Sequence, residues 1–126
     1  MKKAIISTDA PLPIGPYNQA ILKGETLYIS GQIAIHPETN ELITDNIEAE
    51  THRVMMNILA ILAAAEMSID QVVKTTIFLK TMEDFSAVNA IYSTYFKHST
   101  APARETVAVL GLPKNVNIEI SMIAMR

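Results

Sequence analysis

Near the carboxyl end of the chain, two short segments each carry a charged side chain flanked by hydroxyl or amide side chains. In the first, Arg104 and Thr106 lie two residues apart; in the second, Glu119 lies between Asn117 and Ser121. Residues two positions apart in a strand point to the same side, so each segment gathers its polar groups on one face. A guanidinium binds a planar carboxylate with two parallel hydrogen bonds, and a carboxylate can orient or deprotonate water. These residue types indicate a pocket for a small carboxylate-bearing molecule and a hydrolytic step.

The distance between Arg104 and Glu119 depends on how their strands pair. We expect strands over 104–110 and 116–125, joined by Leu112-Pro113-Lys114-Asn115. If these strands form a hairpin, Arg104 comes within cross-strand reach of Glu119 or Ser121, although the sequence does not fix the register. The competing interpretation is an ordinary ion pair in which the two charges neutralise each other. Residue spacing alone favours the ion pair.

Two other segments present groups that could meet a ligand. Ser30 and Gly31 end a predicted strand with a hydroxyl and a residue lacking Cβ, where a ligand could approach main-chain amides. A plain strand-end turn is the alternative. Tyr17 follows Ile14-Gly15-Pro16, which would stiffen a loop and hold the phenol at a pocket rim. A buried tyrosine with a satisfied hydroxyl fits the same residues.

The composition excludes several classes of site. The sequence has no cysteine, which rules out disulfides, thiolate ligands and a catalytic cysteine and favours a reducing, cytoplasmic setting. His36, His52 and His98 lack metal-ligand spacing, and no phosphate-binding glycine loop or GxSxG element is present. The net charge of −3, without clustered Lys or Arg, argues against a nucleic-acid surface. The longest apolar run, 58–65, is too short to span a bilayer.

The rest of the chain must form the elements that position these groups. Its 126 residues, 49% of them hydrophobic, predict one domain over 1–126. Apolar periodicity predicts a helix over 47–66 and a second helix capped by Thr81, whose buried stripe is Phe85, Val88, Ile91, Tyr92 and Tyr95. Strands are expected at 4–7, 17–23, 26–32, 72–80, 104–110 and 116–125. In the 72–80 strand, alternation places Val73, Thr75, Ile77 and Leu79 on one side.

These elements predict an α/β (α+β) fold, a six-stranded mixed sheet with two helices on one face. Two helices cannot cover both faces, so the second face must meet solvent or another subunit. That face would carry Tyr28, Phe78 and Ile123, which are too apolar to stay in contact with water. We therefore expect a homo-oligomer that buries it.

A series of short motifs in order along the chain resembles the RidA family, also called YjgF, of reactive intermediate imine/enamine deaminases. The motifs are Ile14-Gly15-Pro16-Tyr17-Asn18-Gln19-Ala20, Ser30-Gly31-Gln32, Val73-Lys74-Thr75-Thr76, Phe85-Ser86-Ala87-Val88-Asn89, Pro102-Ala103-Arg104, Leu112-Pro113 and Ile118-Glu119-Ile120. The resemblance runs end to end. It implies a chorismate-mutase-like fold and a homotrimer with a barrel-like centre and three clefts between subunits.

The resemblance also implies a function. Family members of the 2-iminobutanoate/2-iminopropanoate deaminase type hydrolyse 2-enamino and 2-imino acids, such as 2-aminoacrylate, to 2-keto acids and ammonia, without a cofactor or metal. At the matching positions, Arg104 binds the substrate carboxylate, Glu119 positions water, and Tyr17, Ser30 and Gly31 line the cleft. The alternatives are a regulatory module that binds a small carboxylate without turnover and the ribonuclease activity reported for some relatives, for which this sequence offers no histidine pair or basic groove.

Two positions depart from the family pattern. Many relatives have Cys where this chain has Thr106, whose hydroxyl and main-chain amide can still donate to a ligand. A second acidic residue, common in relatives after the Glu119 position, is replaced by Ser121, which lowers the charge near the cleft and could alter the substrate range.

Overall fold

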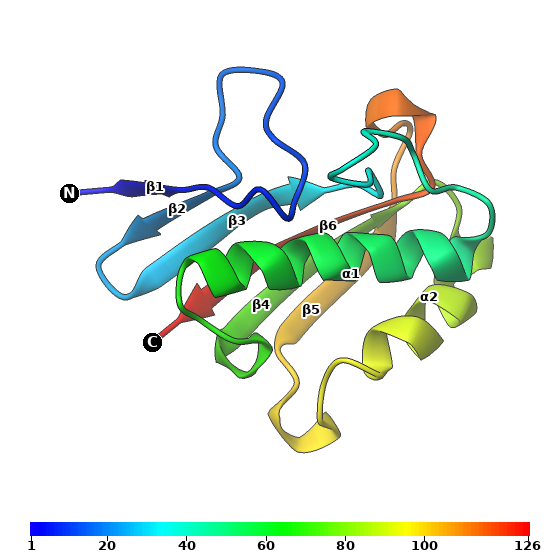
Figure 1. Cartoon of the computed structure of the whole chain (residues 1–126). Coiled ribbons are helices and arrows are strands. Elements are labelled where there is room, and N and C mark those ends of the chain that lie inside the picture. Colours follow the sequence, from blue (N-terminus) through cyan, green and yellow to red (C-terminus); the bar gives the residue numbers. More distant parts are fainter.

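In the computed structural model, which describes residues 1–126, six strands form one mixed sheet in the order β1-β2-β3-β6-β4-β5 (Figure 1). The strands are β1 Lys3–Ile5, β2 Ala20–Lys23, β3 Thr26–Gln32, β4 Val72–Leu79, β5 Ala103–Ala108 and β6 Ile118–Met125. The β4–β5 pair is parallel, and the other pairs are antiparallel. Helices α1, Ile47–Ala64, and α2, Phe85–Ser93, lie over the same face of the sheet (Figure 1). The predicted architecture is confirmed.

Helix α1 and the short turn that leads into α2 each begin at a side-chain cap. The Asn46 side chain accepts a hydrogen bond from Ala49 N at 2.7 Å, which satisfies one of the free N–H groups in the first turn of α1. The predicted cap at Thr81 is present, but Thr81 caps a short 3-10 turn, Met82–Asp84, that leads into α2. Helix α1 ends two residues before the predicted end, and Glu66 adopts a positive φ of 58° just beyond it.

The core lies between the helices and the covered face of the sheet. It contains 22 buried apolar residues from every strand except β5, from both helices and from the connections. Strand β4 contributes Val72, Ile77 and Leu79 to it. Val73, predicted on the buried side, is instead 44% exposed, because the register of β4 against β6 shifts between Val72 and Lys74. Such a bulge moves one side chain to the opposite face.

The last two strands do not form the hairpin that would bring Arg104 within reach of Glu119. Strand β5 pairs in parallel with β4, so that Arg104 lies opposite Thr75 and Thr106 lies opposite Ile77. Strand β6 pairs with β3 and β4. Helix α2 is the crossover connection of a β4–α2–β5 unit, and such a connection places its two strands side by side and parallel. The chain then passes the end of β4, where Lys80 N donates to Asn117 O at 3.0 Å, and inserts β6 between β3 and β4. The strand predicted over 104–110 is observed at Ala103–Ala108, and the strand predicted over 116–125 is observed at Ile118–Met125. The strand predicted over 17–23 begins only at Ala20.

The second face of the sheet carries no helix. Tyr28 and Ile123 lie opposite each other on it, and Phe78 lies opposite Glu119. Polar side chains share the face: Lys74 forms an ion pair with Glu105 at 2.7 Å. Tyr28 is 51% exposed, so the predicted apolar patch is present on this face. No helix of the structure is long and apolar enough to cross a membrane.

Candidate functional site

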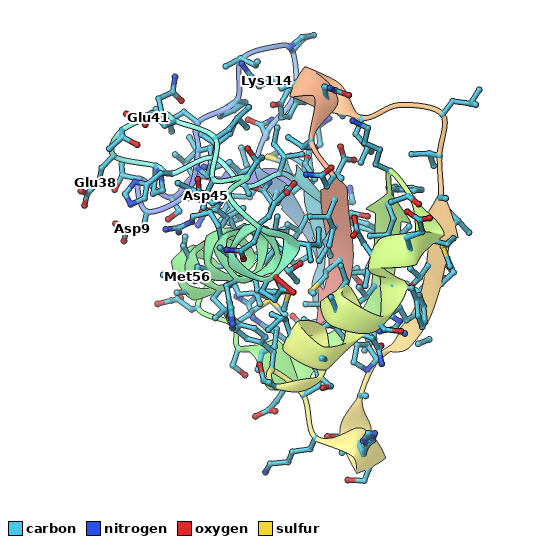
Figure 2. All side chains as sticks on the ribbon, turned by 90° about the vertical axis from the view of Figure 1, so that its right-hand side faces the viewer. Asp9, Glu38, Glu41, Asp45, Met56 and Lys114 are labelled. Atoms are coloured by element: carbon cyan, nitrogen blue, oxygen red, sulfur yellow. The ribbon has the colours of Figure 1, made fainter.

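Glu119 lines a pocket at one end of the sheet, where the loop of residues 6–19 and the 110–117 connection come together. The pocket holds about 150 Å³, and Tyr17, Gly31 and Lys114 also line it. Lys114 lies on the turn beside the long loop (Figure 2). Tyr17 is half exposed, so it is a rim residue as predicted rather than a core tyrosine. The structure therefore brings Tyr17, Gly31 and Glu119 together.

Gly31 lets the Glu119 carboxyl lie directly against the main chain of β3. A Cβ at position 31 would lie 2.7 Å from Cδ of Glu119, closer than real side chains approach. The neighbouring Ser30 has a different task, because its hydroxyl donates to Asn18 O at 2.6 Å and ties β3 to the segment that carries Tyr17. Ser30 thus supports the part of β3 from which Gly31 lines the pocket.

The Glu119 carboxyl has no hydrogen-bond donor or cation as a partner within the chain. Burial raises its pKa above the ordinary range of a glutamate, because a charged carboxylate loses hydration there. A raised pKa makes the carboxylate a better proton acceptor near neutral pH, which is the property that a general base needs.

The long loop of this pocket is held by one buried side chain, Gln19. Its amide nitrogen lies within hydrogen-bond distance of Ser7 O at 3.0 Å, Ala10 O at 3.2 Å and Pro11 O at 2.8 Å. Its oxygen accepts from Ser7 N at 2.7 Å. Gln19 is 1% exposed, so these bonds are shielded from water. They fix the loop that leads to Tyr17.

Two further buried polar side chains, Asn57 and Glu50 of α1, hold the other walls. Asn57 donates to Ile33 O at 3.2 Å and Ile35 O at 3.0 Å, and both of these residues line the pocket. Glu50 accepts from the main-chain N and the side-chain Nδ2 of Asn117, each at 2.8 Å. That contact fixes the chain two residues before Glu119. Sequence patterns did not reveal these supports, because a single polar residue on a helix has no periodic signal.

Arg104 occupies a different place, on the helix-covered side of the edge strand β5. Its Cζ lies 4.9 Å from the ring centroid of Tyr92 and 5.9 Å from that of Phe85. Tyr92 is buried, and its hydroxyl donates to Thr75 Oγ1 at 2.9 Å, so the ring that supports the guanidinium is fixed. The sequence predicted Tyr92 as a core residue only. Its cation–π contact with Arg104 appears only in the fold.

The guanidinium of Arg104 forms no ion pair or hydrogen bond within the chain, in which Lys74–Glu105 is the one ion pair. Thr106 lies two residues after Arg104 on the same face of β5, and its hydroxyl is buried and has no hydrogen-bond partner. An unpartnered buried hydroxyl beside an unpaired guanidinium is typical of a site that accepts an anionic ligand. A cavity of about 290 Å³ opens at Arg104 between α2 and the residues before β5.

One chain does not bring Arg104 and Glu119 together. Strand β4 separates their strands; Arg104 is opposite Thr75 on the covered face, and Glu119 is opposite Phe78 on the open face. The expected cross-strand reach of Arg104 to Glu119 or Ser121 is therefore wrong. So is the alternative that the two charges form an ion pair. No group of three His, Asp or Glu side chains is arranged to hold a metal ion.

Comparison with known proteins decides the family. A family model described as Endoribonuclease L-PSP matches residues 7–126, and a RutC family protein of Saccharolobus solfataricus is 48% identical over all of this chain and 99% of its own. This chain belongs to the YjgF/RidA/RutC family. The crystal structure of the YjgF gene product of E. coli superposes on this fold with a TM-score of 0.92, at 41% identity over 98% of each chain. A family protein of Dermatophagoides farinae, 44% identical over 98% of this chain and 96% of its own, is named 2-iminobutanoate/2-iminopropanoate deaminase.

Proposed function

We propose that this protein is a deaminase of the 2-iminobutanoate/2-iminopropanoate type that hydrolyses reactive 2-imino and 2-enamino acids to 2-keto acids and ammonia. The observation that carries the proposal is the unpaired guanidinium of Arg104, supported on Tyr92 and accompanied by the unpartnered hydroxyl of Thr106. Both groups match what a substrate carboxylate requires. The named deaminase among the relatives supports the same reaction.

Hydrolysis of an imine needs few catalytic groups from the protein. The carbon of a C=N bond is already electrophilic, so a held substrate and an oriented water are sufficient. Arg104 binds the carboxylate. Glu119 takes a proton from water as the oxygen adds to the imine carbon, and passes it to the nitrogen. It then moves the hydroxyl proton of the resulting carbinolamine to the nitrogen, so that the C=O bond forms, the C–N bond breaks and ammonia leaves. One imino acid and one water give one keto acid and one ammonia, with no redox change and no cofactor.

The reaction needs a second subunit, because Arg104 and Glu119 lie on opposite faces of one sheet. In the homotrimer that we propose, the apolar open face around Tyr28 and Ile123 is buried between subunits. Arg104 and Thr106 of one subunit then meet Glu119, Tyr17 and Gly31 of the next in a shared cleft.

The first experiment generates 2-aminoacrylate in situ and measures the release of keto acid with and without the protein. We expect acceleration by the wild type, loss of acceleration by Arg104→Ala, and full activity in the control Arg126→Ala, whose arginine donates to Ala65 O away from both pockets. Full acceleration by Arg104→Ala, or none by the wild type, would contradict the proposal. Saturable binding of 2-ketobutyrate without acceleration would indicate a regulatory module that binds small carboxylates.

A second experiment tests the shared cleft directly. Arg104→Ala and Glu119→Gln are each expected to be inactive, and each leaves one half of the cleft intact. When trimers assemble at random from equal amounts of the two variants, about one quarter of the clefts combine Arg104 from a Glu119→Gln subunit with Glu119 from an Arg104→Ala subunit. About one quarter of wild-type activity should therefore return. If the mixture, verified to have exchanged subunits, stays inactive, the two residues do not act across an interface.

A further inference from the structure

We propose that Lys114 draws anionic substrates to the Glu119 pocket, against the negative charge of the loops around it. This inference rests on the proposed function and adds a residue to its binding machinery. Lys114 lies on the short turn Pro113–Asn115 before β6, and it lines the same pocket as Glu119 (Figure 2).

The main chain at Lys114 has a conformation that is unfavourable for lysine. Lys114 has φ 54° and ψ 22°, and Asn115 follows with φ 55°. Glycine enters this left-handed region without a steric penalty and asparagine tolerates it, but a long side chain is disfavoured there. Glycine would therefore suit the fold better than lysine at position 114. A residue held against its backbone preference points to a function for its side chain.

Contacts on both sides of Lys114 hold the turn in this conformation. Lys80 Nζ donates to Asn115 Oδ1 at 3.1 Å, and the buried Glu50 accepts two hydrogen bonds from Asn117. The Lys114 side chain itself takes no part, because it forms no ion pair or hydrogen bond within the chain. The turn is thus fixed by its neighbours, and the ammonium of Lys114 is free to meet a ligand.

The charges around the pocket show what that ammonium can do. Among the residues that line the pocket, Lys114 is the one cation and Glu119 the one anion. Glu38 and Glu41 are exposed and lie within two residues of Asn40, which also lines the pocket. The whole chain carries a net charge of −3. A small carboxylate that approaches the pocket meets mainly negative charge, which one ammonium at the rim can offset.

This task differs from that of Arg104. A guanidinium holds a bound carboxylate through two parallel hydrogen bonds, whereas a lysine ammonium is a point charge on a flexible stem. Lys114 therefore acts on the approach and capture of the substrate and not on the chemical step. Because the interaction crosses water, salt should screen it, with a Debye length of about 10 Å at 0.1 M ionic strength.

The test measures kcat and kcat/KM for 2-aminoacrylate generated in situ, at about 20 mM and about 500 mM NaCl. At low salt, Lys114→Met should lower kcat/KM by about threefold to tenfold and leave kcat within about twofold, and the difference from the wild type should disappear at high salt. Lys114→Arg, which keeps the charge, should behave as the wild type. The matched control is Lys23→Met, at the far end of the β2–β3 hairpin from Gly31, and it should change neither constant.

Lys114→Gly separates the function of the side chain from the stability of the turn. It should lose as much kcat/KM as Lys114→Met and yet have a urea midpoint no lower than the wild type, because glycine fits the left-handed conformation. A clear fall of the midpoint would mean that the lysine serves the fold, which overturns the inference.

The remaining outcomes separate this inference from the proposed function. If the wild type accelerates hydrolysis but Lys114→Met matches it at low salt, or loses kcat equally at both salt concentrations, the inference is overturned and the deaminase assignment stands. If the wild type gives no acceleration, the proposed function itself fails. Calorimetric titration with 2-ketobutyrate then still tests Lys114: a Kd that Lys114→Met leaves unchanged at low salt contradicts the inference, and a weaker, salt-sensitive Kd supports it.

Discussion

Replacing Gln19 by leucine should release the loop that forms one wall of the Glu119 pocket. The leucine side chain is similar in size and can stay buried, but it can neither donate nor accept a hydrogen bond. The substitution therefore removes the contacts of the Gln19 amide with three carbonyl oxygens and its bond from Ser7 N. Ser7 and Ala10 are buried, so their main-chain groups cannot simply turn to water.

The size of the effect follows from those groups. A buried polar group without a partner costs about 1–3 kcal/mol. Ser7 N, Ser7 O and Ala10 O would all lose their Gln19 partner. The loop can limit this cost by moving into solvent, at the expense of the buried contact of Ala10. We therefore expect the free energy of unfolding to fall by about 2–4 kcal/mol.

Urea unfolding at one fixed protomer concentration measures this change, because an oligomer's stability depends on concentration. With a slope of about 2 kcal/mol per molar urea, the midpoint should fall by at least about 1 M. Limited proteolysis provides a local readout: new cleavage is expected within residues 8–16. Turnover should fall as well, since the loop leads to Tyr17 at the pocket rim.

The matched control is Gln71→Leu. Gln71 is only partly buried and accepts one hydrogen bond, from Ser68 N at 3.0 Å, so its loss should cost less than about 1 kcal/mol. If Gln19→Leu costs no more than Gln71→Leu and its loop stays as resistant to protease as in the wild type, the assignment of Gln19 as the anchor of this loop is wrong.

Three further changes test the site itself. Gly31→Ala should lower kcat by roughly tenfold to a hundredfold, because the new Cβ would displace the Glu119 carboxyl, whereas Gly111→Ala, in open space, should leave kcat unchanged. Tyr92→Phe keeps the ring under Arg104 but loses the hydrogen bond from the hydroxyl to Thr75, so it should cost about 1–2 kcal/mol of stability with little change in KM. Tyr92→Leu should raise KM, because the guanidinium of Arg104 loses the aromatic ring on which it lies. Burial raises the pKa of Glu119, so the folded protein keeps the carboxyl proton at pH values where the unfolded chain has lost it. The free energy of unfolding should therefore fall as pH rises from the ordinary glutamate range through the raised pKa. Urea unfolding at a series of pH values should show this fall in the wild type and not in Glu119→Gln.

Local patterns in the sequence determined most of the elements. The apolar spacing of α1 and the Asn46 cap belong to residues close together in the chain, so periodicity located the helix to within two residues of its observed end. The strands predicted at 17–23 and 26–32 are separated by only a short turn at Gly24, and they pair as the antiparallel strands β2 and β3. Strand alternation also placed Arg104 and Thr106 on one face of β5, as the structure shows.

Tertiary structure alone decided how those elements combine into a site. The side chains of the last two strands do not encode their partners: α2 sets β5 beside β4, and β6 enters between β3 and β4, which puts Arg104 and Glu119 on opposite faces. The role of Gln19 was equally hidden, because its partners are main-chain groups eight to twelve residues away that converge only in the folded loop. Side-chain type and period are local properties and can be derived from sequence, whereas strand order and buried hydrogen-bond partners depend on packing between distant segments.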